Sequence, residues 1–261
     1  MSLLEARELS VRIGSHQVVE NAQVVVNEGE VVGLIGPNGA GKSSLLRALV
    51  GLSEHKGQVF LAGEDAKGLS PRMRALRFAY LPQEREVNWP VSVETVVGLG
   101  RSPHHTGPAA MSDGDRRAID AALAEMDLTH LRERQVQTLS GGERARTLTA
   151  RALAQEAPLV IADEPTAALD PAHQIGLMET FRRLAKTRQG ALLCLHDLGL
   201  AARWCDRIIV MKKGRIVAEG SPARVMTAGL LSEVYGVSAF VDADACGPLV
   251  LPTGLASASA S

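Results

Sequence analysis

The fold is decided by residues 31–43, which read VVGLIGPNGAGKS. The first five residues are a short apolar run, typical of a strand that is covered on both faces of a sheet. The next eight fit the pattern G-x-x-x-x-G-K-[ST] at every fixed position: Gly36-Pro37-Asn38-Gly39-Ala40-Gly41-Lys42-Ser43. Because a strand is predicted before this pattern and a helix at 43–50 after it, we interpret it as a phosphate-binding P-loop.

The residue types in this loop suit a phosphate ligand. Its three glycines let backbone N–H groups wrap the phosphates, and the N-terminus of the following helix adds partial positive charge. Lys42 is expected to reach the β- and γ-phosphates, and the Ser43 hydroxyl is expected to ligate Mg²⁺. The alternative is a glycine-rich turn that happens to precede a lysine.

Composition excludes several classes of protein. The chain has 261 residues, of which 46% are hydrophobic and 22% charged, so it is not a disordered chain. With 28 Lys and Arg against 29 Asp and Glu, the net charge of −1 leaves no surplus to drive binding to nucleic acid. No apolar run approaches the ~18 residues of a membrane span, and the N-terminus lacks a signal-peptide pattern. Three widely spaced cysteines form no C-x-x-C pair, which argues against a zinc ribbon or a disulfide framework.

Strand and helix signals alternate on both sides of the P-loop. This alternation predicts an α/β core with a mainly parallel sheet. The middle of the chain, from about 93 to 156, has helical patterning without a convincing strand, and we interpret it as an inserted subdomain. The other strands are predicted at 11–13, 18–26, 58–61, 78–81, 159–162, 191–195 and 207–210.

Two adjacent carboxylates, Asp163 and Glu164, end the apolar strand at 159–162. In P-loop enzymes such a strand is expected to run beside the P-loop strand. Its first acid serves Mg²⁺ and can place the second near the attacking water. Without the P-loop, the same pair would indicate only a solvated strand end.

A third motif, Leu139-Ser140-Gly141-Gly142-Glu143, opens a helix that runs to Glu156. Alone it is compatible with a turn and a helix cap. Together with the P-loop and the paired carboxylates, however, it resembles the signature loop of the ATP-binding subunits of ABC transporters. The resemblance covers about residues 3–240, and the motifs occur in the family's order.

This resemblance implies a fold class and a division of the chain. The expected class is α/β, a P-loop ATPase core with a mainly parallel sheet plus N-terminal antiparallel strands and an inserted helical subdomain. Residues 1–83 and 157–261 would form the nucleotide-binding core, and residues 84–156 the helical subdomain with the signature loop.

The resemblance also implies a nucleotide site shared between two chains. Ser140, Gly141 and Gly142 would bind the γ-phosphate of an ATP held by a second copy of the protein, in a head-to-tail dimer that buries two nucleotides. The expected cofactors are ATP and Mg²⁺.

Other residues match further motifs of the family. Gln83 would sense Mg²⁺ and water, His196 would contact the γ-phosphate, and Asp170 would belong to the D-loop, although it also fits a helix cap. Ser44 extends the P-loop set. Ile13 takes the position where an aromatic side chain usually stacks on adenine, and His16 is an alternative stacking residue.

The segment after Gln83 resembles one subgroup of the family. Residues 89–97 (WPVSVETVV) and 100–104 (GRSPH) are similar to importers that serve iron–siderophore, haem and cobalamin permeases. The implied partners are transmembrane permease subunits and, indirectly, a periplasmic substrate-binding protein. The implied location is peripheral, at the cytoplasmic face of the inner membrane, with this segment bordering the surface where the permease docks.

The sequence therefore predicts an ATPase subunit that energises uptake of an iron chelate, haem or a siderophore. Cobalamin and oxyanion import remain open. A soluble ABC ATPase that acts on DNA or ribosomes is less favoured, because such proteins usually carry two cassettes or a long coiled coil. A non-catalytic binding module is disfavoured because every catalytic position is filled, and an exporter because exporters commonly fuse the cassette to membrane helices.

Overall fold

The computed structural model describes residues 1–84, 89–105, 111–244 and 247–256. Its centre is a six-stranded sheet in the order β10-β9-β3-β8-β7-β6, in which only β10 runs antiparallel to its neighbour. The strands span β3 Val31–Ile35, β6 Phe78–Leu81, β7 Leu159–Asp163, β8 Gly190–Cys194, β9 Arg207–Lys212 and β10 Arg215–Gly220. The predicted α/β class with a mainly parallel sheet is confirmed.

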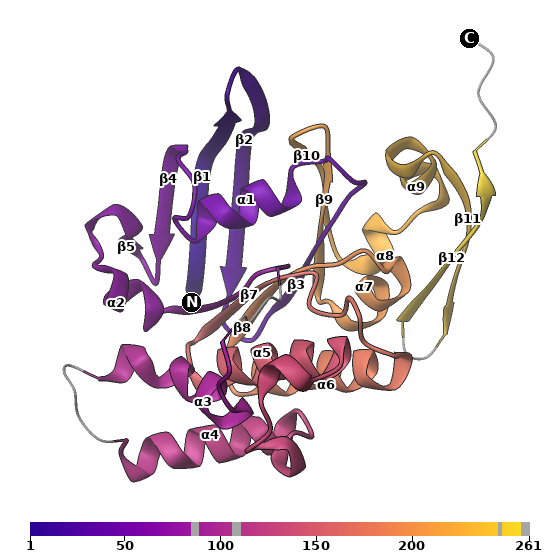
Figure 1. Cartoon of the computed structure of the whole chain (residues 1–261). Coiled ribbons are helices and arrows are strands. Elements are labelled where there is room, and N and C mark those ends of the chain that lie inside the picture. Colours follow the sequence, from indigo (N-terminus) through magenta and orange to yellow (C-terminus); the bar gives the residue numbers. More distant parts are fainter. Residues whose placement is uncertain (85–88, 106–110, 245–246, 257–261) are drawn as a thin grey trace.

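A second sheet of four antiparallel strands lies above the first, in the order β2-β1-β4-β5 (Figure 1). Its strands are β1 Ser2–Ile13, β2 His16–Asn27, β4 Lys56–Leu61 and β5 Glu64–Asp65. A third sheet, near the C-terminus, is a hairpin of β11 Val237–Asp244 and β12 Gly247–Leu255. The sequence analysis missed this hairpin, because Pro248, Pro252 and Gly254 interrupt the strand pattern of β12.

Helices occupy both faces of the central sheet (Figure 1). Helix α1 lies between the two larger sheets, whereas α3 to α6 lie on the opposite side. The helices are α1 Lys42–Leu49, α2 Pro71–Ala75, α3 Val93–Gly98, α4 Asp113–Glu125, α5 Gly141–Ala154, α6 Pro171–Lys186, α7 Leu198–Trp204, α8 Pro222–Val225 and α9 Ala228–Tyr235. Short 3-10 helices span η1 Ala66–Gly68, η2 Leu99–His104, η3 Thr129–Leu131 and η4 Val136–Thr138.

The strands of the central sheet alternate between two hydrophobic cores. In β3, Val32 and Leu34 pack with α1 and the four-stranded sheet, whereas Val31 and Ile35 pack on the side of the helices α3 to α9. All five residues of β3 are buried, as are those of β7 and β8. A strand covered on both faces needs apolar residues at every position, which explains why these runs are apolar without alternation.

One expected neighbour relation is wrong. The strand that carries the paired carboxylates, β7, does not run beside the P-loop strand β3, because β8 lies between them and pairs with both. Since all three strands are parallel, their carboxyl ends still reach the same edge of the sheet. The acids and the P-loop therefore face one common region despite the intervening strand.

The middle of the chain is helical, as predicted. Between β6 and β7 the described residues form helices, turns and one isolated bridge, Ser92 to Gln135. Capping boxes begin two of the helices, at Ser112 with Asp115 for α4 and at Ser140 with Glu143 for α5. Among the described residues, no helix combines the length and apolarity that a bilayer span requires.

Candidate functional site

Ten of the predicted site residues line one open cavity of about 520 Å³ at the carboxyl edge of the central sheet: residues 38–44, Gln83, Glu164 and His196. The loop between β3 and α1 contributes residues 38–41 to its lining, and the first turn of α1 contributes residues 42–44. Gln83, Glu164 and His196 come from the segments that follow β6, β7 and β8. Segments far apart in the sequence thus converge because parallel strands end at the same edge. Val18, at the start of β2, also lines the cavity and was missed by the sequence analysis, because nothing distinguishes it from any other strand valine.

Steric contacts require the first and last glycines of the P-loop. A Cβ at Gly36 would lie 2.2 Å from the carbonyl oxygen of Met211, and a Cβ at Gly41 would lie 2.4 Å from that of Val18. Gly41 has a φ of 99°, a conformation that other residues rarely adopt. The loop is further held by Gly214 in the β9–β10 turn, whose N–H donates to the carbonyl of Ala40 at 2.9 Å.

The Lys42 side chain is buried and folded back onto the P-loop. Its Nζ donates to the carbonyl oxygens of Gly36 at 2.7 Å and Pro37 at 3.1 Å. An ammonium group has three donors, and a bound anion would compete for them with these neutral carbonyls. Because Lys42 is also the first residue of α1, the cation and the helix N-terminus lie together in the cavity wall.

Asp163 fits the predicted metal site. Its side chain is buried at the end of β7, and within the described part of the chain its Oδ1 atom has no hydrogen-bond partner. A buried carboxylate oxygen without a partner is costly unless another group satisfies it. Carboxylate and hydroxyl oxygens are the ligands that Mg²⁺ prefers, so Asp163 together with Ser43 of the cavity wall is a suitable donor set.

Glu164 and His196 form the polar pair of the cavity. The Nε2 atom of His196 lies 2.6 Å from Oε1 of Glu164. Glu164 has a φ of 53°, which is uncommon for a residue other than glycine, and its backbone N–H donates to the carbonyl of Cys194. This left-handed turn directly after β7 gives the two acids different surroundings. Asp163 is buried at the end of the strand, whereas Glu164 lines the cavity.

The signature residues lie outside the cavity. Ser140 caps α5 by accepting a hydrogen bond from Glu143 N–H, and the Glu143 carboxylate accepts in return from Ser140 N–H at 2.7 Å. These hydrogen bonds lower the pKa of Glu143. Ser140 and Gly141 are exposed, and none of the signature residues Ser140 to Gly142 lines the nucleotide cavity of its own chain.

Asp170 and Ile13 also lie outside the cavity lining. Asp170 caps α6, where it accepts from His173 N–H and from the His173 ring, and these hydrogen bonds lower its pKa. Ile13 ends β1 opposite His16 and is 60% exposed. The roles of both residues toward a nucleotide stay predictions.

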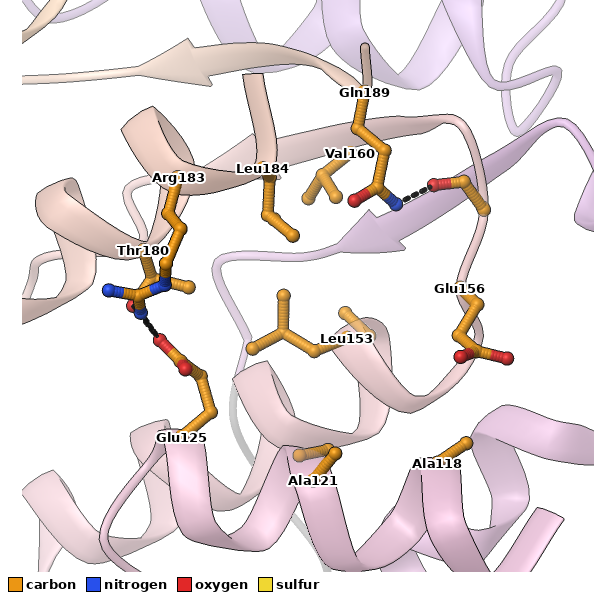
Figure 2. A pocket seen from close by; sticks show the side chains of 13 residues that line it. Ala118, Ala121, Glu125, Leu153, Glu156, Val160, Thr180, Arg183, Leu184 and Gln189 are labelled. Atoms are coloured by element: carbon orange, nitrogen blue, oxygen red, sulfur yellow. Dashed lines mark hydrogen bonds and ion pairs between the residues drawn. The ribbon is translucent and has the colours of Figure 1, made fainter. Parts of the chain in front are cut away.

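A separate cavity of about 230 Å³ lies between α4, α5 and α6 and contains none of the predicted site residues (Figure 2). Glu125 of α4 faces Arg183 of α6 across it and pairs with that guanidinium (Figure 2). Gln189 donates to the carbonyl of Ala157 at 2.8 Å. Alanines and leucines form most of the remaining wall, so this space offers little chemistry to a phosphate.

Comparison with known proteins supports the resemblance deduced from the motifs. The ABC transporter family matches residues 19–167. The Hemin import ATP-binding protein HmuV of Pseudomonas entomophila is 43% identical over 245 residues, which cover 92% of this chain and 94% of that protein. The Cobalamin import ATP-binding protein BtuD of Halobacterium salinarum is 40% identical over 92% of this chain, which spans 61% of that protein's length.

Solved structures agree in fold. A putative metal-chelate type ABC transporter in an inward-facing conformation matches with a TM-score of 0.81 and 25% identity, over 98% of each chain. A dimeric ATP-binding cassette in a post-hydrolysis state, bound to ADP and Pi, matches with a TM-score of 0.74 and 25% identity, over 84% of this chain and 98% of that one.

Proposed function

Because this chain belongs to the ABC transporter family as an ATP-binding subunit, we propose that it hydrolyses MgATP to energise uptake of an iron chelate, haem or a siderophore, through a separate membrane permease. One observation carries the proposal. A single cavity is lined by residues 38–44 together with Gln83, Glu164 and His196, and Asp163 directly precedes Glu164 in the chain. The hemin-import name of several relatives favours haem among the substrates, whereas cobalamin import is the second candidate because of the BtuD relatives.

Each side chain has a chemical task in this proposal. The P-loop amides and Lys42 bind the β- and γ-phosphates and neutralise charge that develops on them. Glu164 accepts a proton from, or polarises, the attacking water, and His196 holds Glu164 through the 2.6 Å contact while facing the γ-phosphate. Ser43, Asp163 and Gln83 would hold Mg²⁺, which would supply positive charge that offsets the negative charge of the phosphates.

The signature loop completes the proposed site in a second copy of the chain. An exposed helix N-terminus with glycine N–H groups is suited to bind an anion. The dimeric cassettes among the structural relatives support a head-to-tail arrangement in which Ser140 to Gly142 of one chain face the nucleotide of the other. In this proposal residues 84–156 form the helical subdomain and the remaining residues the core, and Asp170 lies at the boundary between the two chains.

The proposed partner is a permease at the cytoplasmic face of the inner membrane, with the chain bound peripherally. The segment expected to border the docking surface, residues 89–104, includes η2, whose Leu99, Gly100, Ser102 and Pro103 line a surface groove. The groove and the cavity share no lining residue, so both can be engaged at once. A periplasmic binding protein would act only through the permease.

Reconstitution tests the proposal. The chain would be co-expressed with the permease encoded beside it, the complex placed in liposomes, and ATP hydrolysis measured with the matching binding protein loaded with haem, ferric siderophore or cobalamin. We expect stimulation by one iron chelate and none in a Glu164→Gln complex. Stimulation by cobalamin alone would transfer the proposal to the second candidate, and a lack of stimulation by any of them would contradict import of these substrates.

A further inference from the structure

The C-terminal hairpin of β11 and β12 packs against the helix that follows His196. Helix α7 begins two residues after His196, and Asp197 caps it by accepting a hydrogen bond from Leu200 N–H at 2.8 Å. Helices α7 and α8 lie between the central sheet and the hairpin (Figure 1), and α7 contacts both β3 and β12. His196 therefore precedes a helix that is held from two sides.

Helix α7 is too short to fix its own position. It has seven residues, and an isolated helix of that length is marginal in water. Its partly buried Leu200 and Trp204 pack against the same hydrophobic core as Val241 and Val250 of the hairpin. The position of α7, and with it that of His196, therefore depends on the hairpin as well as on the sheet.

Arg203 in the last turn of α7 forms two hydrogen bonds with Asp244 at the end of β11. Its Nη1 donates to Oδ1 at 2.7 Å, and its Nη2 donates to Oδ2 at 2.8 Å. Both side chains are partly exposed, so the pair contributes little to global stability. Its two-point geometry, however, restricts the direction of the contact as well as its length. The pair thus ties the end of α7 to the hairpin in one orientation.

The other end of the hairpin is anchored at the P-loop. Strand β11 begins at Val237, two residues after Tyr235, which ends α9. Burial raises the pKa of the Tyr235 hydroxyl, and a hydrogen bond with the backbone of Gly36 partly opposes this rise. Nearby, the Nζ of Lys212 donates to the carbonyl of Glu233 at 2.6 Å. Because its base is fixed in this way, the hairpin can restrain α7.

We propose that the hairpin is a positioning element for hydrolysis, in which Asp244, acting through Arg203 and α7, holds His196 where its ring meets Glu164. The inference rests on the proposed function and gives the C-terminal part of the chain a role in it. The 2.6 Å contact between His196 and Glu164 is one that a small displacement of α7 would break. Asp244 does not line the nucleotide cavity, so it acts through other residues.

The first experiment compares Asp244→Asn with Asp242→Asn in the full chain bound to its permease. Both changes remove one negative charge from β11, but Asp242 is exposed and accepts from the neighbouring Ala243 N–H. We expect Asp244→Asn to lower kcat about two- to fivefold, the range that exposed ion pairs commonly contribute, with ATP affinity and melting temperature unchanged. Asp242→Asn should leave all three quantities at the wild-type value.

The conservative variant Asp244→Glu keeps the carboxylate and should retain most of the wild-type kcat. An equal loss of kcat in Asp242→Asn would overturn the inference, because the effect would then follow from the charge of the strand. A fall in melting temperature or in ATP affinity that matches the fall in kcat would also overturn it, because the pair would then support the fold in general.

Two further measurements establish whether the effect passes through His196. In a His196→Gln background, Asp244→Asn should cause no further loss of the residual single-turnover hydrolysis, because residues that act as a unit are not additive. In a spectrum of the full chain with ¹³C-labelled histidine, the ring signal of His196, assigned with His196→Gln, should shift in Asp244→Asn while that of the exposed His130 stays constant.

Additive losses, or a His196 signal that does not move, would overturn the inference. Absence of ATP hydrolysis in the wild-type complex would instead contradict the proposed function. The spectrum would still decide whether Asp244 positions the His196 ring, because it requires no turnover.

Discussion

The chain contains two glycine loops that lead into helices, and they are built in opposite ways. The P-loop before α1 is enclosed by distant segments, with Met211 and Val18 in the space that side chains at Gly36 and Gly41 would need. The signature loop before α5 is held by its own capping box of Ser140 and Glu143 and is exposed. One loop therefore depends on the whole fold, whereas the other depends on four consecutive residues.

This difference teaches where each half of the proposed site is completed. The P-loop meets Gln83, Glu164 and His196 within one molecule, so a single chain can hold the phosphates. The signature loop lies at an exposed helix N-terminus outside this cavity, and in the proposed function the phosphate that it binds comes from a second chain. Binding should then be a property of the monomer and hydrolysis a property of the dimer.

The largest expected effect separates binding from chemistry on the P-loop side. Glu164→Gln should bind ATP and scarcely hydrolyse it, because a positioned base contributes about 10²–10⁴-fold in rate. Phosphate release with the permease present measures the loss, and equilibrium dialysis measures binding. Glu133→Gln, at an exposed position remote from the cavity, is the control. Near-normal hydrolysis by Glu164→Gln would show that the base lies elsewhere.

The second effect tests the other half of the comparison. Gly141→Asp places a negative charge in the first turn of α5, where no atom lies within 4 Å of the added Cβ and where an acid suits the helix dipole. The monomer should fold and bind ATP as before. Its ATP-driven dimer, however, should weaken on the order of 100-fold, because like charges across an interface cost several kcal/mol.

Light scattering with MgATP in a Glu164→Gln background measures this dimer. We expect the parent to be mostly monomeric without nucleotide and dimeric with it, since ATP bound in the interface shifts the equilibrium by mass action. Gly229→Asp makes the same change in the first turn of α9, also in open space, and should leave the dimer intact. Equal dimerisation of the Gly141→Asp variant would place the signature loop outside the interface.

A smaller effect concerns the base of the nucleotide, which neither loop holds. Ile13 offers apolar contact without an aromatic face, and stacking on an aromatic residue is worth about 1–3 kcal/mol. GTP should therefore bind within about tenfold of ATP, and Ile13→Tyr should tighten ATP binding modestly. Competition binding that includes His16→Ala separates the two candidate residues. A strong preference for ATP that His16→Ala leaves unchanged would mean that neither residue recognises the base.

The smallest expected effect is a pH dependence in the stability of the signature loop. Hydrogen bonds from Ser140 lower the pKa of Glu143 from its ordinary 4.5. The Glu143 carboxylate therefore contributes fully to the stability of the start of α5 above pH 4.5, and this contribution is lost as the pH falls through the lowered pKa. The protection of the amides at the start of α5, measured by hydrogen exchange relative to the intrinsic exchange rate at each pH, should thus be constant from pH 8 to 5 and decrease in more acidic solution, by the equivalent of about 0.3–1 kcal/mol. Glu143→Gln keeps the acceptor and should remove this dependence. A dependence that persists would assign it to another acid.

Local chemistry explains how much of this architecture could be predicted. The strand 31–35 and the strand 78–81 lie where the apolar runs placed them, because strands buried on both faces leave an unmistakable pattern. The caps at Ser140 and Asp170 were also recognisable, since each forms its hydrogen bonds within three residues. Signals that act over a few residues can be read from the sequence.

Long-range relations could not be predicted in the same way. The position of β8 between β3 and β7 depends on how whole strands pair with one another. No single residue in these three strands indicates their order in the sheet. Val18 and the Gly214 turn support the P-loop through backbone atoms, which every residue has.

The left-handed backbone of Glu164 has a consequence for protein engineering. A non-glycine residue in such a conformation costs on the order of 1–3 kcal/mol, and glycine or asparagine would relieve that strain. A library selected only for heat resistance would therefore enrich substitutions at this position, and each gain in melting temperature there would remove the carboxylate proposed to act on water. Selection for thermal stability and selection for catalytic turnover therefore favour different residues at this position.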